Sequence, residues 1–426
     1  APVLPEQAGP PAGYPYPPPA PEPETAVVRA SVDEVGQDGN GYSYDPDITP
    51  GGRFVAFTST ADNLVPGDWN EVIDIFVRDL QANTIERVSV SSGGVEGNGE
   101  SYGPSISANG RFVVFYSYAD NLVNNDENGW WSDVFLHDRQ TGETSIISRH
   151  SDGTQGNYDS YDPVISDDGQ LVAYSSHADN LVDVDENGSS SDIFIHDLST
   201  GDTTLVSRHS DGTQGNWSSY QPALSADGQL VAFYSYADNL VDVDENGTTS
   251  DIFVHDLSTG DTSLVSRHSD GTQGNWDSSE AALSADGQQV AFYSNADNLV
   301  DDDFNGWPDV FIHDSSTGDT ALVSRHSDGT PGNWESYGPS ISGDGQFVAF
   351  LSYSDNLIDS DANGATSDVF LHDVQNGLTT LVSKSVTGEQ GNWYSYRSSV
   401  SEDGSIVAFE SNASNLVPLD WNGYVS

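Results

Sequence analysis

The stretch that decides the fold is Ser225-Ala-Asp-Gly-Gln-Leu-Val-Ala-Phe233, followed later in the same repeat by Asp251-Ile-Phe-Val-His-Asp-Leu-Ser-Thr-Gly260. Both parts combine a short apolar run with a glycine turn, and neither has the periodicity of an amphipathic helix. The turn glycine at position 228 recurs along the whole chain at intervals of about 59 residues, at Gly52, Gly110, Gly169, Gly228, Gly287, Gly345 and Gly404. The chain is therefore an array of repeats and not a series of unrelated domains.

Each repeat contains four runs that read as strands, which in the fourth repeat are residues 223–225, 230–234, 251–257 and 262–267. Turn residues separate the runs, which favours antiparallel pairing in sequence order. Four antiparallel strands repeated around an axis define a β-propeller. The sequence predicts an all-β fold, a seven-bladed β-propeller with four-stranded antiparallel blades, of which the last is incomplete.

The quoted repeat resembles the repeat of TolB-type propellers, which belong to the wider group of WD40-like propellers. The resemblance covers about residues 26–426 and implies a fold more than an activity, because such propellers serve as interaction platforms and as accessory domains of enzymes. The repeat count of seven departs from the six blades of TolB itself. We therefore do not expect the partners of TolB to apply to this chain.

The ends of the chain predict how the ring closes. The seventh repeat stops at Ser426, where the first repeat has Asp74 and begins its third strand. Residues 25–31 match the fourth strand, so we expect residues 25–426 to form a propeller closed by pairing of the N- and C-terminal segments. The third strand of the last blade would then be missing. An equally favoured explanation for the missing strand is that the natural polypeptide continues beyond Ser426.

Residues 1–24 form a separate zone that holds ten of the twenty prolines. Such a composition favours extended polyproline II structure, so we expect an N-terminal arm. Its apolar residues Val3, Leu4, Tyr14 and Tyr16 are candidates for docking on a neighbouring copy. The sequence thus predicts a homo-oligomer assembled head to tail, either a ring or a fibre.

Charge and composition exclude several classes of function. The net charge is −55, from 12 basic and 67 acidic residues. A sequence-independent nucleic-acid binder needs a basic surface, so neither nucleic acid nor an anionic membrane is an expected partner. No run of apolar residues is long enough for a membrane span. Cysteine is absent, and the chain begins at Ala1, so we expect a processed extracellular or cell-surface protein, although a halophilic cytosolic origin would also suit the acidity.

Aspartate-rich loops between the second and third strands suggest calcium sites. Alternating side-chain oxygens followed by glycine are typical of the first half of a calcium loop, although the same residues also make good turns. Four loops have the complete spacing, and their candidate ligands are Asp183, Asp185, Asn187, Asp192; Asp242, Asp244, Asn246, Asp251; Asp301, Asp303, Asn305, Asp309; and Asp359, Asp361, Asn363, Asp368. The loop with Asp126, Asn128 and Asp133 is a close variant. The first loop, with Asp68 and Asp74, lacks the first aspartate and is expected to bind weakly or not at all.

An aromatic residue follows asparagine at the same place in five repeats, as Tyr158, Trp217, Trp276, Trp334 and Trp393. We expect these rings to pack between blades, and the alternative is that they stack on sugars, as in a lectin-like binder of carbohydrate or protein. Two sets of repeated histidines are expected to be structural, because each lies far from its copies. Glycosylation sequons occur at Asn187, Asn216, Asn246 and Asn412.

The leading interpretation is a calcium-stabilised structural or assembly module that is not an enzyme. Departures from the repeat, such as Glu280, make no set of nucleophile, base and orienting group.

Overall fold

The computed structural model describes residues 26–418. The predictions for the arm, including Val3, Leu4, Tyr14 and Tyr16, lie outside the described residues. The strands form six four-stranded antiparallel sheets and one two-stranded sheet, arranged around a central opening. The prediction of seven blades is therefore corrected to six complete blades, because the seventh repeat contributes only two strands to the described part of the chain.

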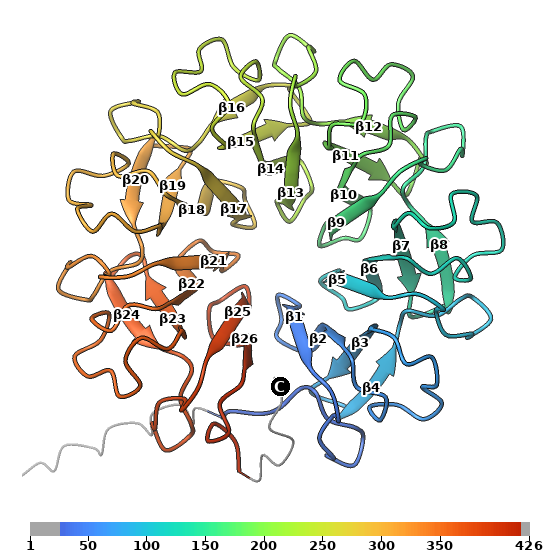
Figure 1. The fold of residues 1–426 in the computed structure, drawn as a ribbon, viewed down its shortest axis with the longest axis horizontal. Helices are drawn as coiled ribbons and strands as arrows, with labels where there is room; N and C mark the ends of the chain where they lie inside the picture. The colour runs from blue at the N-terminus through green and yellow to red at the C-terminus, as the bar shows by residue number, and fades with distance from the viewer. Residues whose placement is uncertain (1–25, 419–426) are drawn as a thin grey trace, which may run out of the picture.

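The blades follow the chain, each with its strands paired in sequence order. In Figure 1 the first strand of each sheet lies nearest the centre. Blade 1 consists of β1 (Ser43–Ile48), β2 (Phe54–Ser59), β3 (Asp74–Asp79) and β4 (Thr84–Arg87). Blade 2 consists of β5 (Ser101–Ile106), β6 (Phe112–Ser117), β7 (Asp133–Asp138) and β8 (Glu143–Ile146). Blade 3 consists of β9 (Ser160–Ile165), β10 (Leu171–Ser176), β11 (Asp192–Asp197) and β12 (Thr203–Leu205).

The remaining sheets repeat this pattern. Blade 4 consists of β13 (Ser219–Leu224), β14 (Leu230–Ser235), β15 (Asp251–Asp256) and β16 (Thr262–Leu264). Blade 5 consists of β17 (Ser278–Leu283), β18 (Gln289–Ser294), β19 (Asp309–Asp314) and β20 (Asp319–Leu322). Blade 6 consists of β21 (Ser336–Ile341), β22 (Phe347–Ser352), β23 (Asp368–Asp373) and β24 (Leu378–Leu381). The seventh sheet consists of β25 (Ser395–Val400) and β26 (Val407–Ser411).

The hydrophobic core lies between neighbouring blades as well as within them. One cluster joins Ala56, Ile75 and Val77 of blade 1 to Val113 and Phe115 of blade 2. Within each complete blade, an aromatic ring of the second strand stacks on a phenylalanine of the third, with centroids 5.8–6.0 Å apart. A single blade could not bury these faces alone, so the blades stabilise one another.

The turn between the first and second strands requires glycine for two reasons. Gly228 has a φ of +69°, in the left-handed region that side chains disfavour. A Cβ at this position would also lie 2.6 Å from Cδ1 of Leu171, which belongs to the preceding blade. The regular turn glycines thus mark the places where neighbouring blades approach most closely.

Backbone hydrogen bonds link these turns from blade to blade, and we call this set the inner belt. The N–H of Asp167 donates to the carbonyl of Ala226, and the N–H of Ala226 donates to the carbonyl of Ala285, at 3.1 and 2.9 Å. The belt also crosses from the seventh sheet to blade 1, where the N–H of Glu402 donates to the carbonyl of Pro50 at 3.0 Å. The belt therefore runs from blade 2 through the seventh sheet to blade 1, where Pro50 has no N–H to donate to blade 2.

The predicted closure by pairing of the two terminal segments remains a prediction. In the described part of the chain, residues 26–31 form no strand, and β26 pairs only with β25.

Candidate functional site

The aspartate-rich loops place only part of each predicted ligand set together. In blade 3 the carboxylate of Asp183 is 96% exposed and lies 3.5 Å from Nε2 of His150. Among residues 26–418, no group of three or more His, Cys, Asp or Glu side chains could hold a metal ion. The side chains of the first aspartates, Asp183, Asp242, Asp301 and Asp359, are 96–101% exposed, and their assignment as metal ligands stays a prediction.

The other two aspartates of each loop form what we call the carboxylate pair, which in blade 3 consists of Asp185 and Asp192. Nε2 of Gln214 donates to both carboxylates, at 3.0 Å to Asp185 and 2.9 Å to Asp192. Burial and the nearby charge of Asp185 raise the pKa of Asp192 to about 7. Oδ1 of Asn187 is buried beside this pair and has no hydrogen-bond partner in the described structure. The cluster therefore holds more acceptors than donors.

Blades 2, 4 and 6 repeat this arrangement, with the amides of Gln155, Gln273 and Gln390 bridging the pairs Asp126/Asp133, Asp244/Asp251 and Asp361/Asp368. The asparagine Oδ1 is likewise buried without a partner at Asn128 and Asn246. In blade 6, however, Gln390 also donates to Oδ1 of Asn363, at 3.0 Å.

Blade 1 carries a positive charge at the same place. Nη1 of Arg87 lies 2.8 Å from Oδ1 of Asp68 and 3.4 Å from Oδ2 of Asp74, and Nη2 lies 3.0 Å from Oε2 of Glu96. The side chain of Arg87 is 9% exposed, so these ion pairs are largely shielded from water. In blade 1 the chain supplies its own cation to the carboxylate pair.

Blade 5 has neither the glutamine nor the arginine. Pro331 and Leu322 stand at the corresponding positions, while the carboxylates of Asp303 and Asp309 are both buried. Nδ2 of Asn305 donates to Oδ2 of Asp309 at 2.5 Å, but Oδ1 of Asp303 is buried without a partner in the described structure. Burial raises the pKa of Asp303 to about 6 and of Asp309 to about 7. Among the six complete blades, this carboxylate pair is the one with neither an arginine nor a glutamine beside it.

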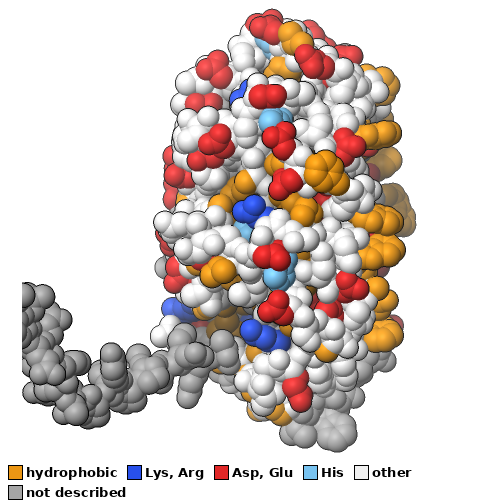
Figure 2. All heavy atoms as spheres, turned by 90° about the vertical axis from the view of Figure 1, so that its left-hand side faces the viewer, with side chains coloured by type: hydrophobic (Ala, Val, Ile, Leu, Met, Phe, Trp, Pro, Cys, Tyr) orange, Lys and Arg blue, Asp and Glu red, His pale blue; other side chains and the backbone are white. Residues whose placement is uncertain are grey.

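The aromatic residues of the loops are exposed and not packed between blades. Trp217, Trp276, Trp334 and Trp393 expose 42–59% of their surface, so the prediction that they are buried packing residues is wrong. Figure 2 shows hydrophobic side chains in a row along one face of the molecule. Trp334 stacks on Trp307 of a neighbouring loop, with centroids 4.6 Å apart, and Tyr158 meets Trp131 edge-on.

The histidines of the third strands are structural, as their repetition predicts. His255 is buried, and its Nδ1 lies 2.8 Å from Oγ1 of Thr262 on the fourth strand. Burial lowers its pKa to about 4, so the ring is neutral near pH 7.

The sequons differ in how accessible their nitrogens are. Nδ2 of Asn187 and of Asn246 donates to a backbone carbonyl at 2.8–2.9 Å inside the loops. Asn216 is exposed and donates to Asp238, whereas Asn412 lies 3.5 Å from the hydroxyl of Tyr396. Attachment of a glycan at Asn187 or Asn246 would require breaking a hydrogen bond that holds the loop.

A cluster of charged residues near the central opening was not predicted as a site. The third residue of the first strand has a positive φ at Asp45, Asp162, Gln221 and Glu280, where a bulge interrupts the strand pairing. The corresponding residue of the seventh sheet is Arg397, whose Nη1 lies 2.5 Å from Oδ1 of Asp45. The signal available in the sequence was the variation of this position from repeat to repeat, with charged residues at Asp45, Asp162, Glu280 and Arg397.

No family model matches this chain, and no curated protein matches its sequence. Solved structures match its fold. An oligogalacturonate lyase from Vibrio parahaemolyticus is 14% identical, with 91% of this chain and 89% of that chain covered and a TM-score of 0.51. A prolyl endopeptidase is 11% identical, with 84% of this chain and 44% of that chain covered and a TM-score of 0.52. TolB from Acinetobacter baumannii is 15% identical over 80% of this chain and 62% of that chain, with a TM-score of 0.42.

These matches correct the expectation that the chain is not an enzyme. Propellers of this fold occur in oligogalacturonate lyase and prolyl endopeptidase, so the fold gives no ground for excluding an enzyme. At this level of identity the likeness shows the fold alone: a β-propeller with four-stranded antiparallel blades. In residues 26–418 there is also no helix with the length and apolar character needed to cross a membrane.

Proposed function

We propose that this propeller is a structural or assembly module of the cell exterior or cell surface that calcium stabilises through its carboxylate pairs. The observation that carries the proposal is the comparison between blades. The second carboxylate of the pair is buried in all six complete blades, and the first is buried in blades 1 and 5 and half-buried in the others. The pair is balanced by Arg87 in blade 1, bridged by a glutamine amide in blades 2, 3, 4 and 6, and left without either in blade 5. A bound cation in blade 5 would supply the positive charge that the guanidinium of Arg87 supplies in blade 1.

The residues present fit a hard divalent cation. Carboxylate and amide oxygens are the ligands that calcium prefers, and an orphaned acceptor such as Oδ1 of Asp303 can be satisfied by a cation. Asp309 and Asn305 would complete the side-chain contribution, while Asp301 would remain in solvent. Bound calcium would lower the cost of burying two like charges and thereby raise the free energy of unfolding.

Thermal unfolding with calcium or with chelator, at matched ionic strength, tests this proposal. With a dissociation constant of roughly 0.1–1 mM, calcium at 10 mM should add about 1.5–3 kcal/mol per site. Asp303→Asn should reduce the calcium-dependent rise in Tm, and Asp301→Asn, the matched control on the same loop, should retain it. Equal midpoints with calcium and with chelator would remove calcium from the proposal.

The exposed tryptophans support a second candidate function, a lectin-like binder of carbohydrate or protein. A partly exposed indole offers a flat apolar surface on which a sugar ring can stack. Trp276 is 59% exposed, and its neighbours on the ring repeat its position. Titration with a panel of saccharides, followed by tryptophan fluorescence, tests this function, and Trp276→Ala should weaken any binding that is found. An unchanged emission spectrum across the panel would count against it.

Self-association through residues 1–24 completes the first proposal. The supporting observation is compositional, namely ten prolines beside Val3, Leu4, Tyr14 and Tyr16. Sedimentation of the intact chain and of a variant that lacks residues 1–24 distinguishes the outcomes. If the intact chain and the variant that lacks residues 1–24 form the same oligomer, the arm does not mediate assembly.

A further inference from the structure

Two tryptophans on neighbouring loops form a parallel stack, which we call the indole pair. Trp307 lies between β18 and β19, and Trp334 lies between β20 and β21. Their ring centroids are 4.6 Å apart, and their ring planes differ by 24°. Trp307 is 39% exposed and Trp334 is 42% exposed. The two indoles together therefore offer solvent a flat apolar surface that is larger than a single ring.

One amide side chain, that of Asn305, holds both loops of the indole pair. Its Oδ1 accepts from the N–H of Trp307 at 2.7 Å. Its Nδ2 donates to the carbonyl of Gly332 at 2.8 Å, two residues before Trp334, and to Oδ2 of Asp309 at 2.5 Å. The positions of the two loops therefore depend on Asp309, one of the two carboxylates of the blade 5 pair.

Trp334 has a second anchor, the hydroxyl of Ser354. The N–H of Trp334 donates to Oγ of Ser354 at 2.9 Å, and that hydroxyl donates to the carbonyl of Trp334 at 2.7 Å. Ser354 is 2% exposed, so both hydrogen bonds are shielded from water. The other repeats have alanine at this position, namely Ala61, Ala119, Ala178, Ala237, Ala296 and Ala413. Because the backbone of Trp334 is fixed before any ligand arrives, less conformational entropy is lost on binding.

Blade 2 has the corresponding aromatic residues, Trp131 and Tyr158, but they form no flat surface. The tyrosine ring meets the indole at an interplanar angle of 70°. Two prolines distinguish blade 5. Pro308 stands directly before the third strand, where blades 2, 3, 4 and 6 have serine, and Pro331 stands where these blades have the bridging glutamine. Proline restricts the backbone on both loops of blade 5, and the parallel stack does not recur in blade 2.

The other carboxylate of the blade 5 pair, that of Asp303, connects the indole pair to the proposed calcium site. Asp303 is 5% exposed, and its Oδ1 has no partner in the described structure. Burial and the charge of Asp303 raise the pKa of Asp309 to about 7, because two nearby buried carboxylates repel each other when both are ionised. This repulsion acts on the carboxylate that accepts from Asn305. A bound calcium ion would remove the repulsion and thereby stabilise the loops of the indole pair.

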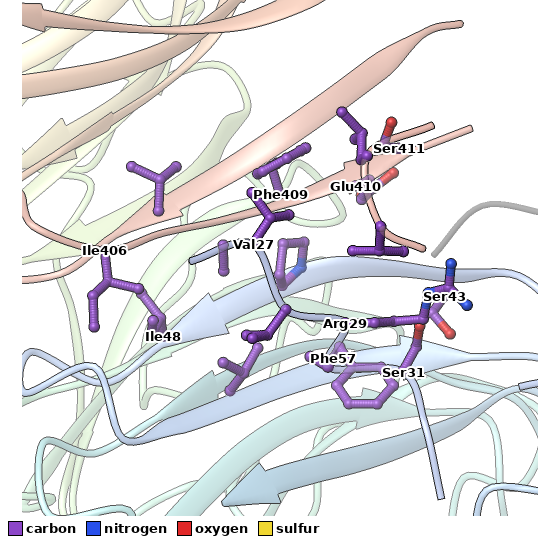
Figure 3. A pocket seen from close by; sticks show the side chains of 18 of the residues that line it. Val27, Arg29, Ser31, Ser43, Ile48, Phe57, Ile406, Phe409, Glu410 and Ser411 are labelled. Carbon is purple, nitrogen blue, oxygen red and sulfur yellow. The ribbon is translucent and has the colours of Figure 1, made fainter. Parts of the chain in front are cut away.

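The main pockets of the described structure lack a comparable surface. The pocket between the first and the seventh sheets is lined by Val27, Phe57 and Phe409, among others, and Figure 3 shows these side chains around it. A second cavity, at the central opening, is lined by the ion pair of Asp45 and Arg397. Among the described residues, no tryptophan lines either of them. The indole pair is therefore the better candidate for stacking on a sugar.

The chemistry around the indole pair favours an uncharged sugar. The axial C–H groups of a β-linked hexopyranose form an apolar face that packs on an aromatic ring, while its equatorial hydroxyls stay in water. Parallel rings suit such a face, whereas recognition of an organic cation places aromatic rings around the charge. On the loop of Trp307, the side chain of Asp301 is fully exposed and Asp302 is exposed beside it. These carboxylates would repel an anionic ligand.

We propose that the indole pair binds an uncharged oligosaccharide of β-linked hexopyranose units, and that calcium at Asp303 and Asp309 fixes the pair in its binding geometry. This binding site rests on the calcium site and on the lectin-like function proposed above. It goes beyond them because it assigns the sugar to Trp307 and Trp334 and makes sugar binding depend on calcium. By linkage, the sugar should raise the affinity for calcium by the same factor.

Isothermal titration calorimetry of the intact protein with cellohexaose and chitohexaose, in calcium, tests the site. We expect saturable binding of at least one hexasaccharide, and about tenfold weaker binding by Trp307→Ala and by Trp334→Ala. Trp131→Ala, the matched control in blade 2, should bind as the parent does, and Trp276→Ala, which removes a single indole, should weaken binding less than Trp334→Ala. No binding of either hexasaccharide would overturn the proposal together with the lectin-like function. Binding that Trp131→Ala weakens as much as Trp307→Ala would keep the lectin-like function and overturn the indole pair as its site.

A chelator and two further variants test the dependence on calcium. Removal of calcium should weaken hexasaccharide binding at least about fivefold, and Asp303→Asn should abolish this difference. Ser354→Ala, which restores the alanine of the other repeats, should weaken binding but keep the calcium-dependent rise in Tm. If Tm does not respond to calcium, the calcium site fails and the proposal fails with it. If Tm responds but the affinity for the sugar is the same with calcium and with chelator, the calcium site stands and the proposal is wrong.

Circular dichroism reports on the indole pair without any ligand. Stacked indoles give an exciton couplet in the far ultraviolet, which the difference spectrum between the parent and Trp307→Ala isolates. We expect this couplet to be larger in calcium than in chelator. Absence of the couplet in calcium would refute the stacked geometry and overturn the proposal.

Discussion

Replacing Arg87 with leucine tests whether the carboxylate pairs need a positive charge. Leucine occupies this position in blades 3–6, so the backbone and the surrounding packing accept it. The substitution removes a guanidinium that lies 2.8 Å from Asp68 and leaves Asp74, which is 1% exposed, without its ion pair. Breaking a buried ion pair by removing one partner costs about 3–5 kcal/mol. We expect a loss of this size in chelator.

Chemical unfolding in guanidinium chloride, with chelator and then with 10 mM calcium, measures the loss and its recovery. Calcium should restore part of the stability of Arg87→Leu, because blade 1 would then resemble blade 5. Arg53→Leu is the matched control: Arg53 pairs with Asp79 but its side chain is 49% exposed, so its loss is expected to cost far less stability than the loss of Arg87. An Arg87→Leu variant as stable as the parent in chelator would refute the charge argument. A loss that calcium does not reduce would refute the calcium site in blade 1.

Three further predictions concern the core, the pH dependence and the aromatic face. Phe253→Ala should cost about 3–5 kcal/mol in denaturant unfolding, because Phe253 is fully buried and stacked on Phe233; a cost below 1 kcal/mol would contradict the packing described. Burial lowers the pKa of His255 to about 4, so its ring takes up a proton on unfolding, and its contribution to stability is lost as the pH falls from about 6.5 to 4. Relative to the parent, His255→Gln should therefore gain on the order of 1–2 kcal/mol between pH 7 and pH 5, and identical pH profiles would argue against this. Trp276→Ala should leave Tm nearly unchanged, since the indole is 59% exposed; a drop of many degrees would show that the ring packs in an assembly.

The sequence predicted the repeat and its strands because periodicity records local structure. Gly228 and its copies mark turns whose backbone excludes other residues, and the Phe253 pattern marks a strand buried on both faces. The sequence could not reveal that Asp183 points into solvent beside His150, because a spacing of alternate residues fixes the order of side chains but not the path of a loop.

The exposed tryptophans were misjudged for a related reason. The repetition of Trp217 and Trp276 is compatible both with buried indoles that pack between blades and with indoles exposed to solvent. Only the position of the loop relative to the blades decides whether the indole is buried or exposed. The role of Arg87 was visible in principle, because it stands where the other repeats have leucine or isoleucine. That Arg87 forms ion pairs could not be predicted, because its partners Asp68 and Glu96 lie on different loops that only the fold brings together. The two-stranded seventh sheet followed from the count of third strands.

The inner belt has a consequence for how a ring of this kind can change over evolutionary time. Its links, such as those from Asp167 to Ala226 and from Ala226 to Ala285, join backbone atoms only, so they tolerate any residue except a proline at the donor position, as at Pro50. A duplicated repeat with an N–H at this position would bring with it one donor and one acceptor for its neighbours, and a deleted repeat would remove one of each. Gene rearrangements that add or remove whole repeats could therefore keep the hydrogen bonds of the inner belt. The side chains of the outer loops could meanwhile change and acquire different functions.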